Sequence, residues 1–117
     1  MATVKQFEDL EVWQESITLT RDIYLMFKNC KDYGFKDQIQ RSAVSIPSNI
    51  SEGFERLTDK DAARFFSIAK GSAGELRTQI YLASLLNYIE QNEKMEFIER
   101  ITSISKMLSG LIKYRLQ

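Results

Sequence analysis

Apolar residues recur at helical spacing in four stretches of the chain, and this pattern constrains the fold more than any other feature. The stretches span residues 10–29, 36–55, 59–86 and 92–114. Spacings of three and four residues place the apolar side chains on one face of a helix. The sequence contains one Pro and five Gly, too few for an all-β chain with many tight turns. Four helices with short connections predict a single all-α domain over residues 1–117, an antiparallel up-down-up-down four-helix bundle.

The second predicted helix contains Pro47, which removes one backbone donor and crowds the preceding turn. The apolar pattern keeps its phase on both sides of the proline. We therefore expect one continuous helix with a kink at Pro47. Ser42, Ser45 and Ser48 are candidates to satisfy backbone groups that the kink would free.

Several residues mark where the predicted helices begin and end. Thr58 and Asp61 have the spacing of a capping box at the start of the third helix. Asn87 can end that helix in a left-handed turn, and Asn92 can cap the next one. Gly34 can take the left-handed conformation in the first connection.

Two helices carry more apolar residues than one buried face requires. In the first helix we assign the core face to Leu10, Trp13, Ile17, Ile23, Tyr24 and Phe27. That assignment leaves Val12, Leu19 and Met26 as surplus, and the third helix adds Leu82 and Leu85. Unburied apolar surface of this kind favours association with a partner. Gly71 and Gly74 cost stability in the middle of a helix, and close backbone packing would explain them.

The sequence offers little chemistry for catalysis. It contains no histidine and a single cysteine, Cys30, which excludes histidine-based catalytic and metal sites and any intrachain disulfide. We therefore predict no enzyme activity, no metal and no cofactor. Ser45, Ser48, Asn49 and Glu52 form a polar set beside the core stripe of the second helix. This set is either an internal hydrogen-bonding network or a binding patch.

The formal charge is balanced, with 16 basic and 16 acidic side chains and no histidine. A dedicated nucleic-acid binder usually has a basic excess, which this chain lacks overall. The first ten residues do not resemble a secretory signal, and no apolar run is long enough to span a bilayer. We therefore expect a cytoplasmic protein with no membrane contact.

Three blocks of the sequence resemble a known protein family. They are residues 7–14 (FEDLEVWQ), residues 37–53 (DQIQRSAVSIPSNISEG), and residues 65–69 (FFSIA) followed by Gly71-Ser72 and Glu75-Leu76. The chain is similar to four-helix-bundle proteins encoded in intervening sequences of bacterial 23S rRNA genes. That group also includes the accessory variability protein of diversity-generating retroelements.

The resemblance implies a bacterial protein that forms a ring-shaped homopentamer and has no established catalytic residues. The retroelement relatives bind nucleic acid and a reverse transcriptase through a basic ring, whereas this chain has no net charge. Our first functional hypothesis is a non-enzymatic homo-oligomeric scaffold that binds RNA, DNA or a reverse transcriptase-like protein. The alternative is a scaffold for a protein partner only. The candidate nucleic-acid-binding residues are Arg41, Arg64, Lys70, Arg77, Lys106 and Lys113.

Overall fold

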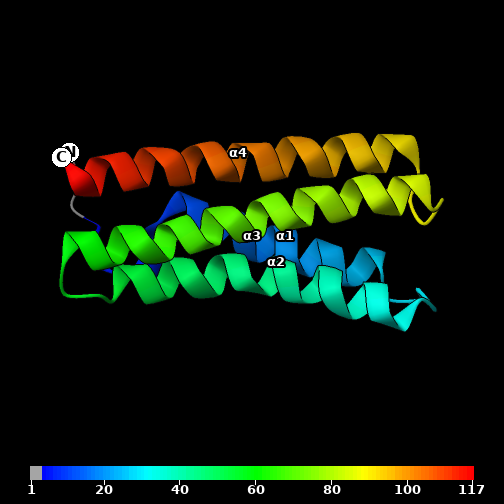
Figure 1. The fold of residues 1–117 in the computed structure, drawn as a ribbon, viewed down its shortest axis with the longest axis horizontal. Helices are drawn as coiled ribbons and strands as arrows, with labels where there is room; N and C mark the ends of the chain where they lie inside the picture. The colour runs from blue at the N-terminus through cyan, green and yellow to red at the C-terminus, as the bar shows by residue number, and fades with distance from the viewer. Residues whose placement is uncertain (1–3) are drawn as a thin grey trace.

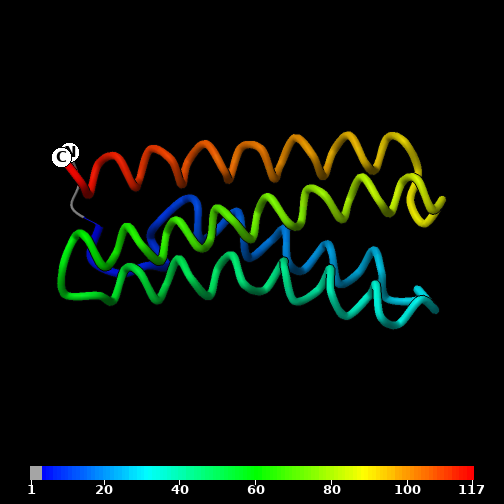
Figure 2. The backbone as a smooth tube through the Cα atoms, in the orientation of Figure 1, coloured from blue at the N-terminus to red at the C-terminus, as the bar shows by residue number. Residues whose placement is uncertain are grey.

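The computed structural model describes residues 4–117. A short 3-10 helix, η1 (Phe7–Asp9), precedes four α-helices, and residues 4–117 contain no strand. The helices are α1 (Glu11–Met26), α2 (Tyr33–Phe54), α3 (Asp59–Leu85) and α4 (Gln91–Leu116). Successive helices run in opposite directions in a rod of 43 × 23 × 19 Å (Figure 1 and Figure 2). The predicted all-α four-helix fold is confirmed.

Each helix packs on its neighbours in sequence, and α4 closes the bundle against α1. The buried face of α3 alternates small and large residues, with Ala69 and Ala73 beside Phe66 and Leu76. Alanine at these positions allows α2 and α4 to approach α3 closely, while the larger side chains fill the space between the layers. Leu108 of α4 is also fully buried and belongs to the same core.

The predicted core face of α1 was partly wrong. Leu19 is fully buried and Val12 nearly so, although both were expected to be surplus, whereas Ile17 and Tyr24 are exposed. The buried face contains Ser16, whose hydroxyl donates to the carbonyl of Trp13 at 2.8 Å. A polar residue in the middle of the buried stripe hides the phase of the pattern when only apolar residues are counted.

Pro47 lies inside the continuous helix α2 and is buried. Because proline has no N–H, the carbonyl of Ala43, four residues earlier, has no helical donor. The side chain of Thr20 in α1 replaces that donor. Its Oγ1 lies 3.1 Å from the Ala43 oxygen and 2.7 Å from the Ser16 oxygen, so the hydroxyl proton is shared. The predicted kink at Pro47 stays a prediction.

The serines that we expected near Pro47 have other partners. Ser45 Oγ lies 2.8 Å from Ser72 Oγ of α3, and the Ser48 carbonyl accepts a hydrogen bond from Ser51. The group that satisfies the freed carbonyl is therefore on another helix. It could not be found by searching residues close to Pro47 in the sequence.

Two predicted helix ends are confirmed. The Thr58 hydroxyl accepts a hydrogen bond from the Asp61 N–H at 3.1 Å and caps α3. Asn87 has φ 61° and ends α3, and its N–H donates to the carbonyl of Ser84. The next N–H, that of Tyr88, donates to the carbonyl of Ala83. This pair of bonds forms a Schellman motif.

Two other predicted helix ends were wrong. Asn92 lies within the first turn of α4, and the N-cap is Glu90, whose N–H donates to the Glu93 carboxylate at 2.7 Å. Gly34 lies in the first turn of α2 without a positive φ, and Asp32 caps that helix by accepting from the Phe35 N–H. A carboxylate residue is therefore the N-cap of both α2 and α4.

The glycine that packs against a neighbour is Gly53 rather than Gly71 or Gly74. A Cβ at Gly53 would lie 2.8 Å from the Phe66 ring and 3.0 Å from the Ala62 carbonyl oxygen. A Cβ at Gly71 or Gly74 would meet no other atom within 4 Å. Packing inside one subunit therefore explains Gly53 and leaves the two glycines of α3 unexplained.

We predict that Thr20→Val lowers the free energy of unfolding by about 1 kcal/mol, because the Ala43 carbonyl loses its donor. Thr18→Val is the matched control. The Thr18 side chain is exposed and bonds only within α1, so its loss should cost less than about 0.5 kcal/mol. Urea unfolding measures both. In a Pro47→Ala background, where residue 47 regains an N–H, Thr20→Val should cost less. An equal cost in both backgrounds would contradict this role for Thr20.

We predict that Gly53→Ala costs about 1–3 kcal/mol, because the new methyl group overlaps the Phe66 ring. Gly110→Ala is the comparison, since Gly110 is an exposed glycine of α4 with open space around it. That change should gain up to about 1 kcal/mol from helix propensity. Thermal and urea unfolding report the sign of each effect. The same sign for both variants would refute the packing role assigned to Gly53.

Candidate nucleic-acid interface

The structure divides the six predicted basic residues into two groups. Arg41 lies on α2 and Arg64 on α3, and each is held by a carboxylate of its own helix. The remaining four lie on α3 and α4 and are Lys70, Arg77, Lys106 and Lys113. Within residues 4–117, none of these four makes a salt bridge.

Arg41 is neutralised within α2. Its Nε lies 2.9 Å from the Asp37 carboxylate, one helical turn earlier. Both side chains are largely exposed, so this pair contributes little to stability. It nevertheless cancels the local field of Arg41, which weakens its case as a phosphate ligand.

Arg64 belongs to a cluster at the α2–α3 turn. Its guanidinium is 3.3 Å from the Asp61 carboxylate and stacks 4.5 Å from the centre of the Phe65 ring. Arg56 stacks on the same ring at 4.4 Å and also pairs with Glu52 at 3.5 Å. These contacts hold the turn and neutralise Arg64. They also give Glu52 a role outside the polar set in which we had placed it.

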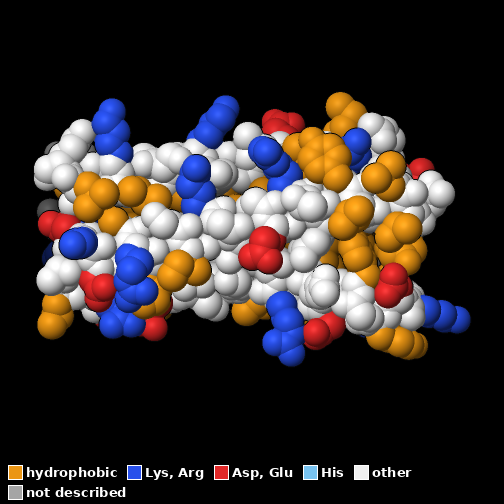
Figure 3. Space-filling model, viewed as in Figure 1, with side chains coloured by type: hydrophobic (Ala, Val, Ile, Leu, Met, Phe, Trp, Pro, Cys, Tyr) orange, Lys and Arg blue, Asp and Glu red, His pale blue; other side chains and the backbone are white. Residues whose placement is uncertain are grey.

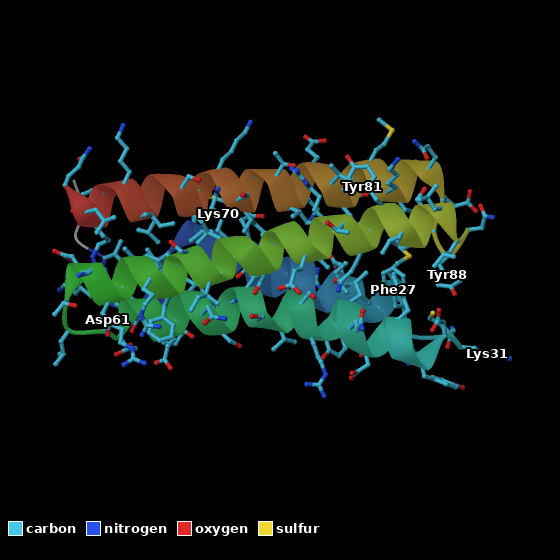
Figure 4. The ribbon with its side chains drawn as sticks, viewed as in Figure 1. Phe27, Lys31, Asp61, Lys70, Tyr81 and Tyr88 are labelled. Carbon is cyan, nitrogen blue, oxygen red and sulfur yellow. The ribbon has the colours of Figure 1, made fainter. Side chains whose placement is uncertain are left out.

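Lys70 and Arg77 flank a groove of about 230 Å³ between α3 and α4. Ala73 and Gly74 form its α3 side, and Ile101 and Ser105 its α4 side. No carboxylate lines this groove. Figure 4 shows Lys70 at the border between the two helices. Between the two basic side chains Gly74 is exposed, whereas Ala73 is fully buried.

Lys106 and Lys113 are exposed on α4, outside the lining of this groove. Residues seven apart on a helix share a face and lie about 10 Å apart along the axis. Figure 3 shows Lys and Arg side chains spaced over α4 and its border with α3, with isolated acidic groups between them. We call the surface formed by Lys70, Arg77, Lys106 and Lys113 the α3–α4 face.

The sequence itself distinguishes the two salt-bridged arginines from the other four basic residues, by a spacing that the prediction did not use. Arg41 has an acid four residues earlier and Arg64 has one three residues earlier, which is the spacing of helical ion pairs. None of the four residues of the α3–α4 face has an acid three or four residues away in either direction. Glu75 and Glu99, the acids that offered a neutralising alternative, make no salt bridge in the part of the chain described.

The polar set of α2 forms an internal network in part. Ser45 Oγ contacts the buried Ser72 of α3 at 2.8 Å, and Asn49 Nδ2 donates to Ser45 Oγ at 3.0 Å and to its carbonyl at 2.8 Å. Ser48 is exposed. Ser45, Asn49 and Ser72 therefore join α2 to α3 rather than forming a binding patch. Ser72 was missing from the predicted network because its partner lies 27 residues away.

No group of three or more Cys, Asp or Glu side chains among residues 4–117 is arranged to hold a metal ion. None of the helices in this range combines the length and hydropathy that crossing a bilayer requires.

The model of the 23S rRNA-intervening sequence protein family matches residues 8–110. The chain belongs to this family. A solved structure from the S23 ribosomal protein family, that of a Bacteroides thetaiotaomicron protein with unknown function, is 26% identical and superimposes with a TM-score of 0.82. The match covers 87% of this chain and 98% of that one. A search of curated proteins finds no match.

Proposed function

We propose that this 23S rRNA-intervening sequence protein is a non-enzymatic homo-oligomeric scaffold that binds nucleic acid through its α3–α4 face. The observation that carries the proposal is the set of four basic residues without an acidic partner on two adjacent helices. The chain is neutral overall, but a local cluster of like charge can attract a polyanion at zero net charge. The family takes its name from 23S rRNA-intervening sequences, which makes RNA the first ligand to test.

Self-association would multiply this local charge. A symmetric assembly repeats the α3–α4 face once in every subunit, so one RNA strand can contact several copies. The outer surface of α3 supports association, because Gly71 faces open space outside the α3–α4 groove and Leu82 and Leu85 are 44% and 78% exposed. The resemblance to the retroelement proteins supplies the number five. It also supplies a reverse transcriptase-like protein as a candidate partner.

A protein partner without nucleic acid is the second candidate function. It is favoured by exposed apolar side chains near the α3–α4 connection, among them Leu85, Leu86 and Met95. Tyr81 lies in the same region, where its ring contacts Lys94 at 4.9 Å (Figure 4). An apolar cluster at the end of a rod suits a protein better than a polyanion.

We predict that Lys70→Glu with Arg77→Glu weakens binding of labelled RNA at least tenfold, whatever the RNA sequence, because two phosphate contacts become repulsive. Arg41→Glu with Arg64→Glu reverses the same amount of charge on residues that carboxylates already hold. It should change affinity less than about threefold. Fluorescence anisotropy measures both, and circular dichroism verifies the fold.

Salt provides the second arm of this experiment. Four phosphate contacts predict a loss of affinity of roughly 50- to 150-fold between 50 and 200 mM salt. The Lys70→Glu, Arg77→Glu variant should have a shallower salt dependence. No binding at low salt, or equal weakening by the two double variants, would favour the scaffold for a protein partner only.

We predict that light scattering reports an oligomer, and five copies if the resemblance holds. Gly71→Gln should reduce the measured mass, because the new side chain fills the space that a second helix would occupy. Gly110→Gln is the control, since Gly110 also faces open space but lies on α4. A monomer at micromolar concentration, or no effect of Gly71→Gln, would overturn this assignment.

A further inference from the structure

A second groove lies between α1 and α4, and its chemistry differs from that of the α3–α4 face. Its volume is about 570 Å³. Met26 and Phe97 form an apolar floor, and Leu25 stands beside them with 62% of its surface exposed. Asp22, Glu93 and Glu96 also line this space, which we call the α1–α4 groove.

The cation in the lining of this groove is already neutralised. Arg100 Nη1 lies 2.9 Å from the Asp22 carboxylate and 4.0 Å from that of Glu96. Burial acts to raise the pKa of Asp22, but hydrogen bonds from Arg21 and Arg100 outweigh it and lower the pKa below the usual value. Asp22 therefore stays ionised at neutral pH. Glu93 and Glu96 leave the groove with excess negative charge.

The groove thus combines an apolar floor with an acidic rim. An exposed leucine beside a buried phenylalanine gives an apolar side chain a place to pack, with a gain of about 25 cal/mol for each Å² removed from water. The carboxylates favour Lys or Arg beside that anchor and repel a phosphate backbone. A helix with one apolar stripe and basic flanks carries both features at the required spacing.

From this complementarity we infer that the α1–α4 groove docks a basic amphipathic helix of a partner protein. The inference goes beyond the proposed nucleic-acid contact and uses none of its residues. Helix α4 lines both grooves, with Ile101 and Ser105 on one side and Glu93, Glu96 and Arg100 on the other. A scaffold of this form holds a polyanion and a basic protein on opposite flanks of one helix.

The probe is a synthetic helical peptide of about 18 residues, with Leu at positions i, i+3, i+4 and i+7 and Lys at most others. A peptide of the same composition in scrambled order is its control. Anisotropy of the labelled peptide gives the affinity, and amide chemical shifts of the protein locate the contact. The ordered peptide should bind at least fivefold more tightly than the scrambled one, with shifts around Leu25 and Phe97.

Two variants test the groove. Glu96 is 72% exposed on its side chain, so Glu96→Lys should leave the fold intact and weaken peptide binding about fivefold. Glu75→Lys makes the same charge change on an exposed residue of α3 and should have little effect. Leu25→Ser tests the apolar anchor without changing charge and should also weaken binding about fivefold.

The inference fails if the scrambled peptide binds equally well, if Glu75→Lys weakens binding as much as Glu96→Lys, or if the shifts map outside the groove. Dissociation of the oligomer by the peptide would instead assign the groove to a second copy of this chain. Because Glu96→Lys leaves the α3–α4 face unchanged, RNA binding that persists in this variant separates the two proposals.

Discussion

The hydrogen bond from Thr20 to the carbonyl of Ala43 is the constraint on which the placement of α1 depends. Pro47 leaves that carbonyl without a helical donor, and a buried carbonyl without a partner costs about 1–3 kcal/mol. The bundle avoids this cost only if α1 places Thr20 beside Ala43 of α2. This contact ties one level of α1 to α2, and the Asp22–Arg100 pair two residues further along α1 ties it to α4.

Charge is segregated around α4 although the chain as a whole is neutral. The Asp22–Arg100 pair joins α1 to α4, and a second pair between Arg115 and Asp59, 2.7 Å apart, joins α4 to α3. These two ion pairs neutralise charged side chains where the helices pack against one another. Among residues 4–117 the four bases of the α3–α4 face make no salt bridge, and the lining of the α1–α4 groove has three carboxylates and one guanidinium. This distribution suits a scaffold that holds two different partners.

The sequence predicts those features that depend on local spacing. The four helices, the Thr58 cap and the left-handed Asn87 follow from periodicity and from the chemistry of helix ends. The buried face of α1 could not be predicted correctly from the apolar periodicity, because Ser16 interrupts the apolar stripe. Neither the partner of Ala43 nor the packing of Gly53 could be predicted, since each depends on a residue of another helix. The lack of salt bridges at the four bases of the α3–α4 face, seen within residues 4–117, could have been predicted from the sequence. None of these bases has an acid three or four residues away.

Photocrosslinking of thiouridine-labelled RNA to the wild-type protein, followed by mass spectrometry of the crosslinked peptides, tests directly whether RNA binds at the α3–α4 face. It reads out which helices touch the RNA without altering any charge. Binding through the α3–α4 face predicts crosslinks in α3 between residues 70 and 77 and in α4 between residues 105 and 113. It predicts none in the segment of α1 that carries Asp22 and Leu25. Crosslinks concentrated in α1 or around Arg41, or none at all at low salt, would contradict it.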